Sequence, residues 1–213
     1  MMEQSKIDNY VSPRGAHAYK ADYDNKLHRQ LSDRWERAIF ARMFAAVGHS
    51  ESLLDLPCGA GRLYDLFQQH ATRVIEADFS PSMLALNAAD HGRRASGYVR
   101  CSGLRIPLAD RAVETVVSVR LNHHLATPVD RELHLRELMR VAGRAVITTY
   151  FSYNSVKNLL RRLRRPFDRK GPKHTLATGR VLELAREAGF APRRLQPLSR
   201  LGSGHVFALL ERR

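Results

Sequence analysis

The stretch Ser52-Leu53-Leu54-Asp55-Leu56-Pro57-Cys58-Gly59-Ala60-Gly61-Arg62 decides how the rest of the chain is interpreted. A short apolar run ends near Asp55, a turn of small residues follows, and a helix is expected to begin at Arg62. This order predicts a buried parallel strand that passes into a helix through a loop whose backbone can approach a ligand closely. Gly59 and Gly61 favour such a loop because a residue without a Cβ can adopt positive φ and puts no side chain between backbone and ligand.

Strands and helices alternate on both sides of this turn. Short apolar or β-branched runs predict strands, and runs with apolar residues three or four apart predict helices. The predicted strands are Ser52–Asp55, Arg73–Asp78, Gly97–Arg100, Glu114–Val119 and Ala145–Tyr150, with a C-terminal pair at Arg193–Leu198 and His205–Leu210. The predicted helices are one from Ser32, one at Arg62–His70, one from Ser80-Pro81, one at Asp130–Val141 and one at Thr178–Ala188. Such alternation builds an open, mostly parallel sheet with helices on both faces, finished here by an antiparallel hairpin.

Three of these helices have recognisable ends or faces. Ser32 is expected to be the N-cap of the first helix and Gly48 its stop, and Thr178 is expected to cap the last helix. The apolar stripe of the first helix consists of Trp35, Ile39, Phe40, Met43, Phe44 and Val47. The apolar face of the Asp130–Val141 helix consists of Leu133, Leu138 and Val141.

Length and composition favour one ordinary globular domain: the chain has 213 residues, of which 44% are hydrophobic and 26% charged. We expect a lid and a helix at residues 1–48 and a core at residues 49–213, with a basic insertion around residues 151–177. Lys plus Arg number 35 against 21 Asp plus Glu, which gives a net charge of +14. This surplus favours an anionic partner such as nucleic acid, phospholipid headgroups or an acidic substrate; the alternative is a surface of solvated arginines.

Other features favour the cytoplasm. Cys58 and Cys101 have no metal-site spacing and are expected to be reduced thiols. The N-terminal residues lack the apolar core of a secretory signal, and no apolar run approaches the roughly 18 residues of a membrane span. We therefore expect a cytoplasmic protein without a metal, whose contact with an anionic membrane is at most peripheral.

Three classes of ligand use a glycine turn between a strand and a helix. A phosphate-binding loop requires Gly-Lys-Ser/Thr, whereas Gly61 is followed by Arg-Leu. A dinucleotide site has a third glycine where Tyr64 stands. The remaining class is S-adenosylmethionine. Asp78 lies 17 residues beyond Gly61, at the end of the second strand, where a carboxylate accepts both ribose hydroxyls, and Asp55 suits the methionine ammonium. The alternative is that both acids only cap strand ends and helices.

In its ordered motifs the chain resembles the class I S-adenosylmethionine-dependent methyltransferases. The segments similar to that family are Leu53–Arg62, Glu76–Leu84, Leu104–Pro107 with Val113-Glu114, Arg120–Leu125 and Arg136–Val141. The resemblance covers roughly residues 50–150. It implies a Rossmann-like, mostly parallel seven-stranded sheet with helices on both faces and a C-terminal antiparallel hairpin, and it implies S-adenosyl-L-methionine as cofactor.

The resemblance also implies which residues bind the cofactor: Asp55, Pro57, Cys58, Gly59, Gly61, Asp78, Phe79, Met83, Ser102, Gly103 and Arg120. The chain departs from the family pattern in three places. Pro57 replaces the first glycine of the turn, where the fixed φ of proline is suitable. Ser102 stands where the family has an acid near the adenine, so a hydroxyl would bond there without charge. The usual Pro-Gly-Gly turn is shortened to Ala142-Gly143-Arg144.

Methyl transfer from a sulfonium is an in-line displacement, for which good positioning can supply on the order of 7–11 kcal/mol. His123 and His124 follow the fourth strand and are candidate catalytic bases. The alternative is that at least one of them only packs beneath the sheet edge. Asn122 is a candidate substrate-binding residue, and Arg120 alternatively binds an anionic acceptor.

Four further residues are candidates for substrate binding. Tyr19 and Tyr23 belong to the expected lid, although they could simply pack against the first helix. Arg161 and Arg165 lie in the basic insertion, where arginines interleave with leucines and Phe167. That pattern is typical of an amphipathic helix on an anionic membrane or lipid-like substrate. It also suits a phosphate backbone, though with little aromatic surface for stacking, or a solvated helix without a ligand.

Two functions therefore stay open from the sequence. The first is a methyltransferase that uses S-adenosylmethionine and acts on a small-molecule or lipid-like acceptor, neutral or anionic. The second is a non-catalytic adaptor of the same fold that binds anionic lipid or RNA, with nucleic acid the less favoured partner. The acceptor atom is not identified by any of these motifs.

Overall fold

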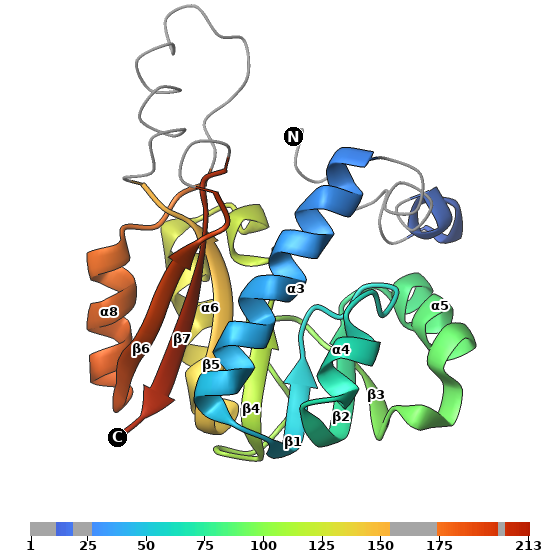
Figure 1. Ribbon diagram of the computed structural model, residues 1–213, viewed down its shortest axis with the longest axis horizontal. Helices are drawn as coiled ribbons and strands as arrows, with labels where there is room; N and C mark the ends of the chain where they lie inside the picture. The colour runs from blue at the N-terminus through green and yellow to red at the C-terminus, as the bar shows by residue number, and fades with distance from the viewer. Residues whose placement is uncertain (1–11, 19–26, 154–173, 200–202) are drawn as a thin grey trace, which may run out of the picture.

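The computed structural model describes residues 12–18, 27–153, 174–199 and 203–213, and its centre is a seven-stranded sheet (Figure 1). The strands are β1 (Ser50–Asp55), β2 (Ala71–Asp78), β3 (Gly97–Arg100), β4 (Val113–Ser118), β5 (Ala142–Phe151), β6 (Phe190–Pro197) and β7 (His205–Arg212). Their order across the sheet is β3-β2-β1-β4-β5-β7-β6. The pairs from β3 to β5 are parallel, whereas β7 runs antiparallel to both β5 and β6. The predicted mostly parallel sheet with a C-terminal antiparallel hairpin is confirmed.

Helices cover both faces of the sheet (Figure 1). The helices are α3 (Leu27–Val47), α4 (Tyr64–Gln68), α5 (Pro81–His91), α6 (Pro128–Val141) and α8 (Thr178–Glu187). Two single 3-10 turns, η1 (Gly92–Arg94) and η2 (Asn122–His124), and a short helical segment at residues 13–18 complete the described helical structure. Apolar side chains of α3 and α4 pack on one face, and those of α6 and α8 pack on the other.

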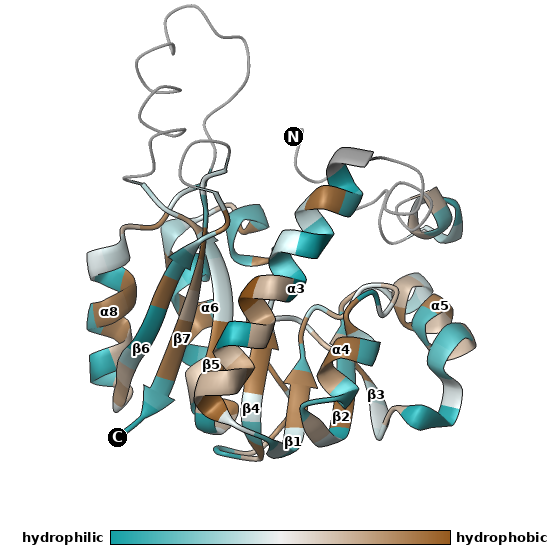
Figure 2. Cartoon of the chain, in the orientation of Figure 1, coloured by the Kyte–Doolittle hydropathy of each residue, from teal (hydrophilic) through white to brown (hydrophobic). Residues whose placement is uncertain are grey.

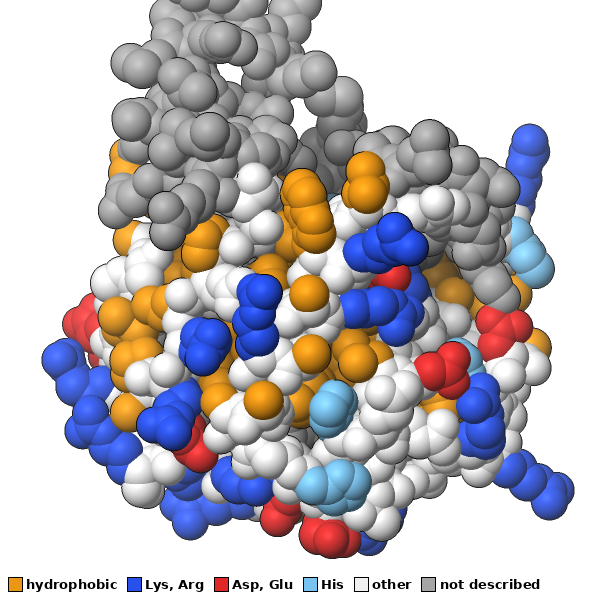
Figure 3. Space-filling model, viewed as in Figure 1, with side chains coloured by type: hydrophobic (Ala, Val, Ile, Leu, Met, Phe, Trp, Pro, Cys, Tyr) orange, Lys and Arg blue, Asp and Glu red, His pale blue; other side chains and the backbone are white. Residues whose placement is uncertain are grey.

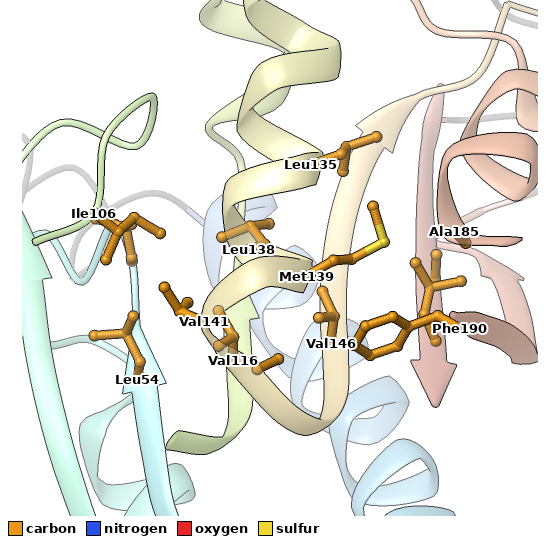
Figure 4. Close-up of a cluster of buried hydrophobic side chains, with 14 of the residues drawn as sticks. Leu54, Ile106, Val116, Leu135, Leu138, Met139, Val141, Val146, Ala185 and Phe190 are labelled. Carbon is orange, nitrogen blue, oxygen red and sulfur yellow. The ribbon is translucent and has the colours of Figure 1, made fainter. Parts of the chain in front are cut away.

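Each face of the sheet has its own hydrophobic core. On one face, Leu54, Val116 and Val146 of the central strands meet Leu138 and Met139 of α6 (Figure 4). Other residues of the same strands belong to the core on the opposite face, and Figure 2 shows mostly hydrophobic residues along the central strands. Buried parallel strands require this pattern because helices cover both of their faces.

The core on the other face is aromatic. The Phe40 ring of α3 meets the rings of Phe67 and Phe207 edge-on, with centroids 5.4 and 5.5 Å apart. Phe207 belongs to β7 and Phe67 to α4, so this one side chain joins α3 to segments that are distant in the sequence. Edge-to-face pairs of this kind each contribute about 0.5–1.5 kcal/mol beyond the burial of their surface.

Four local predictions were wrong, two of them because a hydroxyl that was expected to cap a helix makes a tertiary hydrogen bond instead. Helix α3 begins at Leu27, so Ser32 lies inside it, where its hydroxyl accepts a hydrogen bond from Arg120. The N-cap of α8 is Ala177, and the Thr178 hydroxyl instead accepts from Tyr150. Trp35 is 55% exposed and Leu133 40% exposed, although both were assigned to apolar faces.

Two predicted junctions also have a different form. The expected helix at Arg62–His70 is shorter, because residues 57–63 form turns before α4. Helix α6 passes directly into β5 at Ala142, without a separate turn. The guanidinium of Arg212 donates to the carbonyls of Met139 and Ala142 at 2.9 and 2.7 Å. It thus supplies hydrogen-bond donors to carbonyls at the end of α6, where the helix itself provides none.

A buried histidine ties α6 to the carboxyl end of the sheet. His134 lies between the Ser118 hydroxyl, 3.0 Å from Nε2, and the Gly103 carbonyl, 2.8 Å from Nδ1. Because a carbonyl only accepts, Nδ1 carries the proton and Nε2 accepts from Ser118. Burial lowers the pKa of His134 to about 4.

This pKa predicts a stability that depends on pH. Between pH 6.5 and about 4 the unfolded chain binds a proton at residue 134 that the folded chain does not, so the free energy of unfolding falls with the pH over that window. The full loss is about 3 kcal/mol, at 1.36 kcal/mol per pH unit. We expect the stability advantage of the wild type over His134→Asn to shrink as the pH falls from 7 to 4.5, measured by urea unfolding at each pH.

The wild type is compared with His134→Asn because Glu76 changes the free energy of unfolding with pH in the opposite direction. Burial raises the pKa of Glu76 to about 7, so its contribution to stability is lost as the pH rises through that value. Both proteins carry Glu76, and its effect cancels in the difference. A difference that stays constant across the pH range would contradict the assignment of a neutral, buried His134.

Candidate functional site

The candidate site lies at the edge of the sheet where the parallel strands end. The glycine turn follows β1, Asp78 is the last residue of β2, and residues 119–124 follow β4. Strands β2 and β4 flank β1, so these three segments converge beside one another. The chain leaves β1 toward β2 on one side and returns through β4 on the other. In open α/β sheets, ligands bind at this kind of switch point, outside the carboxyl ends of the strands.

The glycine turn is held by both neighbouring strands. The Leu56 amide donates to the carbonyl of Val117 at 3.0 Å, and the Cys58 amide donates to that of Ala77 at 2.8 Å. Gly59 has a φ of +56°, and a Cβ built on it would meet no described atom within 4 Å. The backbone at Gly59 therefore faces open space, as a loop that binds a ligand through its backbone requires.

At Gly61, glycine is required by close packing and not by an open approach to a ligand. Its φ is +79°, and a Cβ there would lie 2.6 Å from Oδ1 of Asn87 and 2.6 Å from Cδ2 of His91, both on α5. The His91 ring also lies 3.1 Å from the Gly61 carbonyl through Nε2. Gly61 thus allows α5 to pack against the turn rather than opening the turn to a ligand.

Asp78 joins the glycine turn to the start of α5. Its Oδ2 accepts from the Gly59 amide at 2.9 Å, and its Oδ1 accepts from the Ser80 amide at 2.8 Å. Burial raises the pKa of Asp78, and the backbone hydrogen bonds from Ser80 and Gly59 act against that rise. Each carboxylate oxygen has a second lone pair, so these bonds leave acceptor capacity on both oxygens.

Two more acids are buried beneath the turn. Asp55 and Glu76 are neighbours across β1 and β2, and both are almost fully inaccessible. Burial, together with the charge of Glu76, raises the pKa of Asp55 well above its ordinary value. Asn87 donates to Glu76 at 2.5 Å, but Oδ1 of Asp55 and Oε1 of Glu76 have no hydrogen-bond partner among the described residues. Glu76 was not predicted as a site residue; an acid inside a strand that is otherwise buried is the signal for it.

Four further residues that were predicted to bind the cofactor take two kinds of position. Phe79 follows Asp78 and is 53% exposed, and Ser102 is partly buried with its hydroxyl accepting from Leu104 at 3.2 Å. Met83 is buried against Ala60 of the turn and Ala16 of residues 13–18. Gly103 is crowded, because a Cβ there would lie 2.6 Å from Leu121. Phe79 and Ser102 are thus the two that retain accessible surface.

Arg120 is engaged by α3. Its Nε donates to the Glu36 carboxylate at 2.8 Å, and its Nη2 donates to the same carboxylate and to the Ser32 hydroxyl. Arg62, directly after the glycine turn, donates to the other oxygen of Glu36 at 2.9 Å and also pairs with Asp33. Sequence reasoning did not find Glu36 or Arg62, because their contacts join segments that are far apart in the chain.

Aromatic and imidazole rings gather where β4, β5 and β7 meet. The His123 ring lies 4.3 Å from Phe151 and 4.9 Å from His205, and Phe151 lies 4.2 Å from His205. His124 is exposed, and its ring is 4.1 Å from that of His123. Phe151 and His205 were not predicted; they are paired in register on β5 and β7, which only the strand pairing reveals.

Of the other predicted substrate residues, Asn122 lies in the segment after β4 but its side chain is engaged by α6, and four lie outside the described residues. Asn122 is buried and its amide donates to the Arg131 carbonyl at 3.0 Å, so it holds η2 against α6. Tyr19, Tyr23, Arg161 and Arg165 lie outside the described residues, as does most of the basic insertion. On the face drawn in Figure 3, the described basic side chains are scattered among hydrophobic and acidic ones.

Within the described ranges, no cluster of three or more His, Cys, Asp or Glu side chains has an arrangement that could hold a metal ion. Cys58 and Cys101 are buried free thiols, and burial raises the pKa of each. None of the described helices combines the length and the apolar character needed to cross a bilayer.

Comparisons with known proteins identify methyltransferases as similar in sequence and in fold. Residues 54–146 match the methyltransferase domain family. The chain is 34% identical over 151 residues to the demethylmenaquinone methyltransferase of Thermobifida fusca, which covers 67% of this chain and 62% of that protein. It is 31% identical over 123 residues to the tRNA U34 carboxymethyltransferase of Shewanella frigidimarina, covering 54% of this chain and 36% of that protein. The chain thus spans less than two thirds of the length of either relative.

Solved structures share the fold at low sequence identity. The magnesium protoporphyrin IX methyltransferase from Synechocystis PCC 6803 with bound S-adenosylhomocysteine superposes with a TM-score of 0.78 at 12% identity, covering 99% of this chain and 100% of that one. The N-methyltransferase NodS from Bradyrhizobium japonicum gives a TM-score of 0.70 at 12% identity, covering 98% and 97%. Residues 54–146 of the chain are therefore a methyltransferase domain, and the chain shares the fold of these solved methyltransferases.

Proposed function

We propose that this protein binds S-adenosylmethionine at the carboxyl edge of the sheet and transfers its methyl group to a small-molecule acceptor. The observation that carries the proposal is the pair of hydrogen bonds at Asp78, which bring the open backbone of Gly59 and a buried carboxylate together at the ends of β1 and β2. A glycine turn beside an acid at the end of the next strand is the combination that a nucleoside with a charged tail requires.

The residues fit the parts of that ligand in order along the edge. The turn at Gly59 suits the methionine end, because it lies above the Asp55 oxygen that has no hydrogen-bond partner in the described part of the chain. Asp78 has acceptor capacity for the ribose hydroxyls. The exposed ring of Phe79 and the hydroxyl of Ser102 suit the adenine, as an aromatic surface and a polar edge.

The cofactor, when bound, supplies an electrophilic methyl group on a positively charged sulfur. The chain's own contribution is to hold the acceptor in line with that group and to exclude water, which accounts for most of the catalysis expected of such a transfer. His123, beside Phe151 and His205, is the candidate to take a proton from an acceptor that carries one.

The cluster of rings formed by His123, Phe151 and His205 supports the proposal of an apolar or planar acceptor. The ring centroids of His123, Phe151 and His205 lie 4.2 to 4.9 Å apart, and rings of this kind favour flat apolar molecules through stacking. Two similar proteins are named for small acceptors, demethylmenaquinone and magnesium protoporphyrin IX. A lipid-like acceptor, and peripheral contact of the basic insertion with an anionic membrane, are parts of the proposal that rest on the sequence.

The first test is cofactor binding. Asp78→Asn is expected to weaken binding of S-adenosylhomocysteine by roughly 10- to 100-fold, because the loss of a charged hydrogen-bond acceptor costs about 1.5–3 kcal/mol. Isothermal titration calorimetry measures the change, and thermal unfolding checks that the variant is folded. Asp65→Asn is the matched control, since Asp65 is an exposed acid on α4 that pairs with Arg94. A wild-type protein that binds no S-adenosylhomocysteine would refute the proposed function.

The second test is transfer to an acceptor. The wild-type protein is incubated with methyl-labelled S-adenosylmethionine and either an organic-solvent or an aqueous extract of cells. We expect label in the organic extract, because the proposed acceptor is apolar. His123→Phe keeps the ring but removes the nitrogens, and the rate should fall by roughly 10²–10⁴-fold if His123 is the base.

The control for this loss is His49→Phe, since His49 lies just before β1, at the other end of the strand, and contacts Thr72. Binding of S-adenosylhomocysteine by His123→Phe should stay within about twofold of the wild type, because no proton is moved in binding. An unchanged rate in His123→Phe shows that His123 only packs against Phe151, and label confined to the aqueous extract contradicts the apolar acceptor.

A further inference from the structure

A buried carboxylate on α3 bridges two arginines at the edge of the sheet. Glu36 is 1% exposed, and its oxygens accept from Arg62 Nη2 at 2.9 Å and from Arg120 Nε at 2.8 Å. Asp33 pairs with Arg62, and Ser32 accepts from Arg120. We call these five residues the Glu36 cluster. It joins α3 to the glycine turn on one side and to the end of β4 on the other.

Both arginines border the part of the site assigned to the methionine end of the cofactor. Arg62 comes directly after Gly61, and Arg120 is the second residue after β4. The backbone of Arg120 has a φ of +62°, and its amide donates to the Thr149 hydroxyl at 2.7 Å. A non-glycine residue in this region costs of order 1–3 kcal/mol, so the surrounding structure holds the Arg120 side chain in a defined direction.

The charges of the cluster are matched internally. Glu36 and Asp33 face the guanidinium groups of Arg62 and Arg120, while Arg37, 37% exposed, pairs with Asp33 from the outside. A buried carboxylate stays charged only when partners of this kind compensate its lost hydration. The two arginines therefore share one carboxylate between them, and in this structure the shared carboxylate is that of Glu36.

The amino-acid end of the cofactor carries the same chemical group. We infer that Arg62 and Arg120 form the site for the α-carboxylate of the cofactor, and that Glu36 occupies this site until the cofactor displaces it. The inference rests on the proposed function. It makes Glu36 an internal competitor that lowers the affinity for ligands with an amino-acid carboxylate and leaves the affinity for ligands without one unchanged.

The test compares two ligands on two proteins. S-adenosylhomocysteine has the carboxylate, and its decarboxylated analogue retains the adenosine, the sulfur and the amine. Glu36→Gln keeps the shape of the side chain and removes its negative charge. We expect the variant to bind S-adenosylhomocysteine roughly 3- to 10-fold more tightly than the wild type, and the decarboxylated analogue within about twofold, by calorimetry.

Glu132→Gln is the matched control. Glu132 accepts hydrogen bonds from two nitrogens of Arg180 between α6 and α8, so it is also a carboxylate paired with an arginine. It lies on the other face of the sheet from α3. Both ligands should bind this variant as they bind the wild type. A loss of affinity in Glu36→Gln for S-adenosylhomocysteine, or an equal change for both ligands, would overturn the inference. Glu36 would then only hold α3 against the sheet.

A second measurement uses the wild type alone and so does not depend on the folding of a variant. Hydrogen exchange in peptides that cover residues 32–37 should be faster with S-adenosylhomocysteine than with the decarboxylated analogue, because displacement of Glu36 loosens this part of α3. Equal or slower exchange with S-adenosylhomocysteine overturns the inference. If the wild type binds neither ligand, the proposed function fails and this inference fails with it. If it binds both, the proposed function stands, and the inference is decided by how much Glu36→Gln changes the affinity for one ligand relative to the other.

Discussion

The site depends on one buried carboxylate that accepts two backbone hydrogen bonds. Asp78 ends β2, and the amides of Gly59 and Ser80 both point at it. Ser80 is also the N-cap of α5, where the aligned peptide dipoles favour negative charge. The Asp78 carboxylate is therefore compensated by the turn and by the helix together. Without it, the Gly59 amide would lose its partner, and the turn would be tied to β2 through the hydrogen bond from the Cys58 amide to Ala77.

This edge concentrates charge that the fold itself does not need. Burial raises the pKa of Asp55, Glu76 and Asp78, which means that their ionised forms are destabilising where they lie. Natural sequences retain such groups mainly where function requires them, because well-packed apolar residues would give a more stable core. A positively charged ligand above these acids reduces the cost of their ionisation, which is consistent with a sulfonium as the proposed ligand.

How far the sequence predicted this site depends on how far apart the interacting residues are. The glycine turn, Asp78 and the Ser80-Pro81 helix start were predictable because their signals lie within a few residues of each other. The pairing of Phe151 with His205 follows from the register of β5 on β7, which no local pattern encodes. Ser32 and Thr178 had the chemistry of caps, yet their hydroxyls bond to Arg120 and Tyr150, since tertiary contacts override local preference.

Helix α3 is attached to the sheet by two kinds of contact that respond differently to a ligand. Near its C-terminal end, Phe40 and Phe44 pack into an aromatic core with Phe67 and Phe207, and such packing has one favoured arrangement. Closer to its N-terminal end, Glu36 is held by ion pairs whose partners can accept another carboxylate in its place. The aromatic contacts therefore keep α3 on the sheet while the ion pairs exchange, so a ligand that displaces Glu36 has to loosen only the part of the helix above the site.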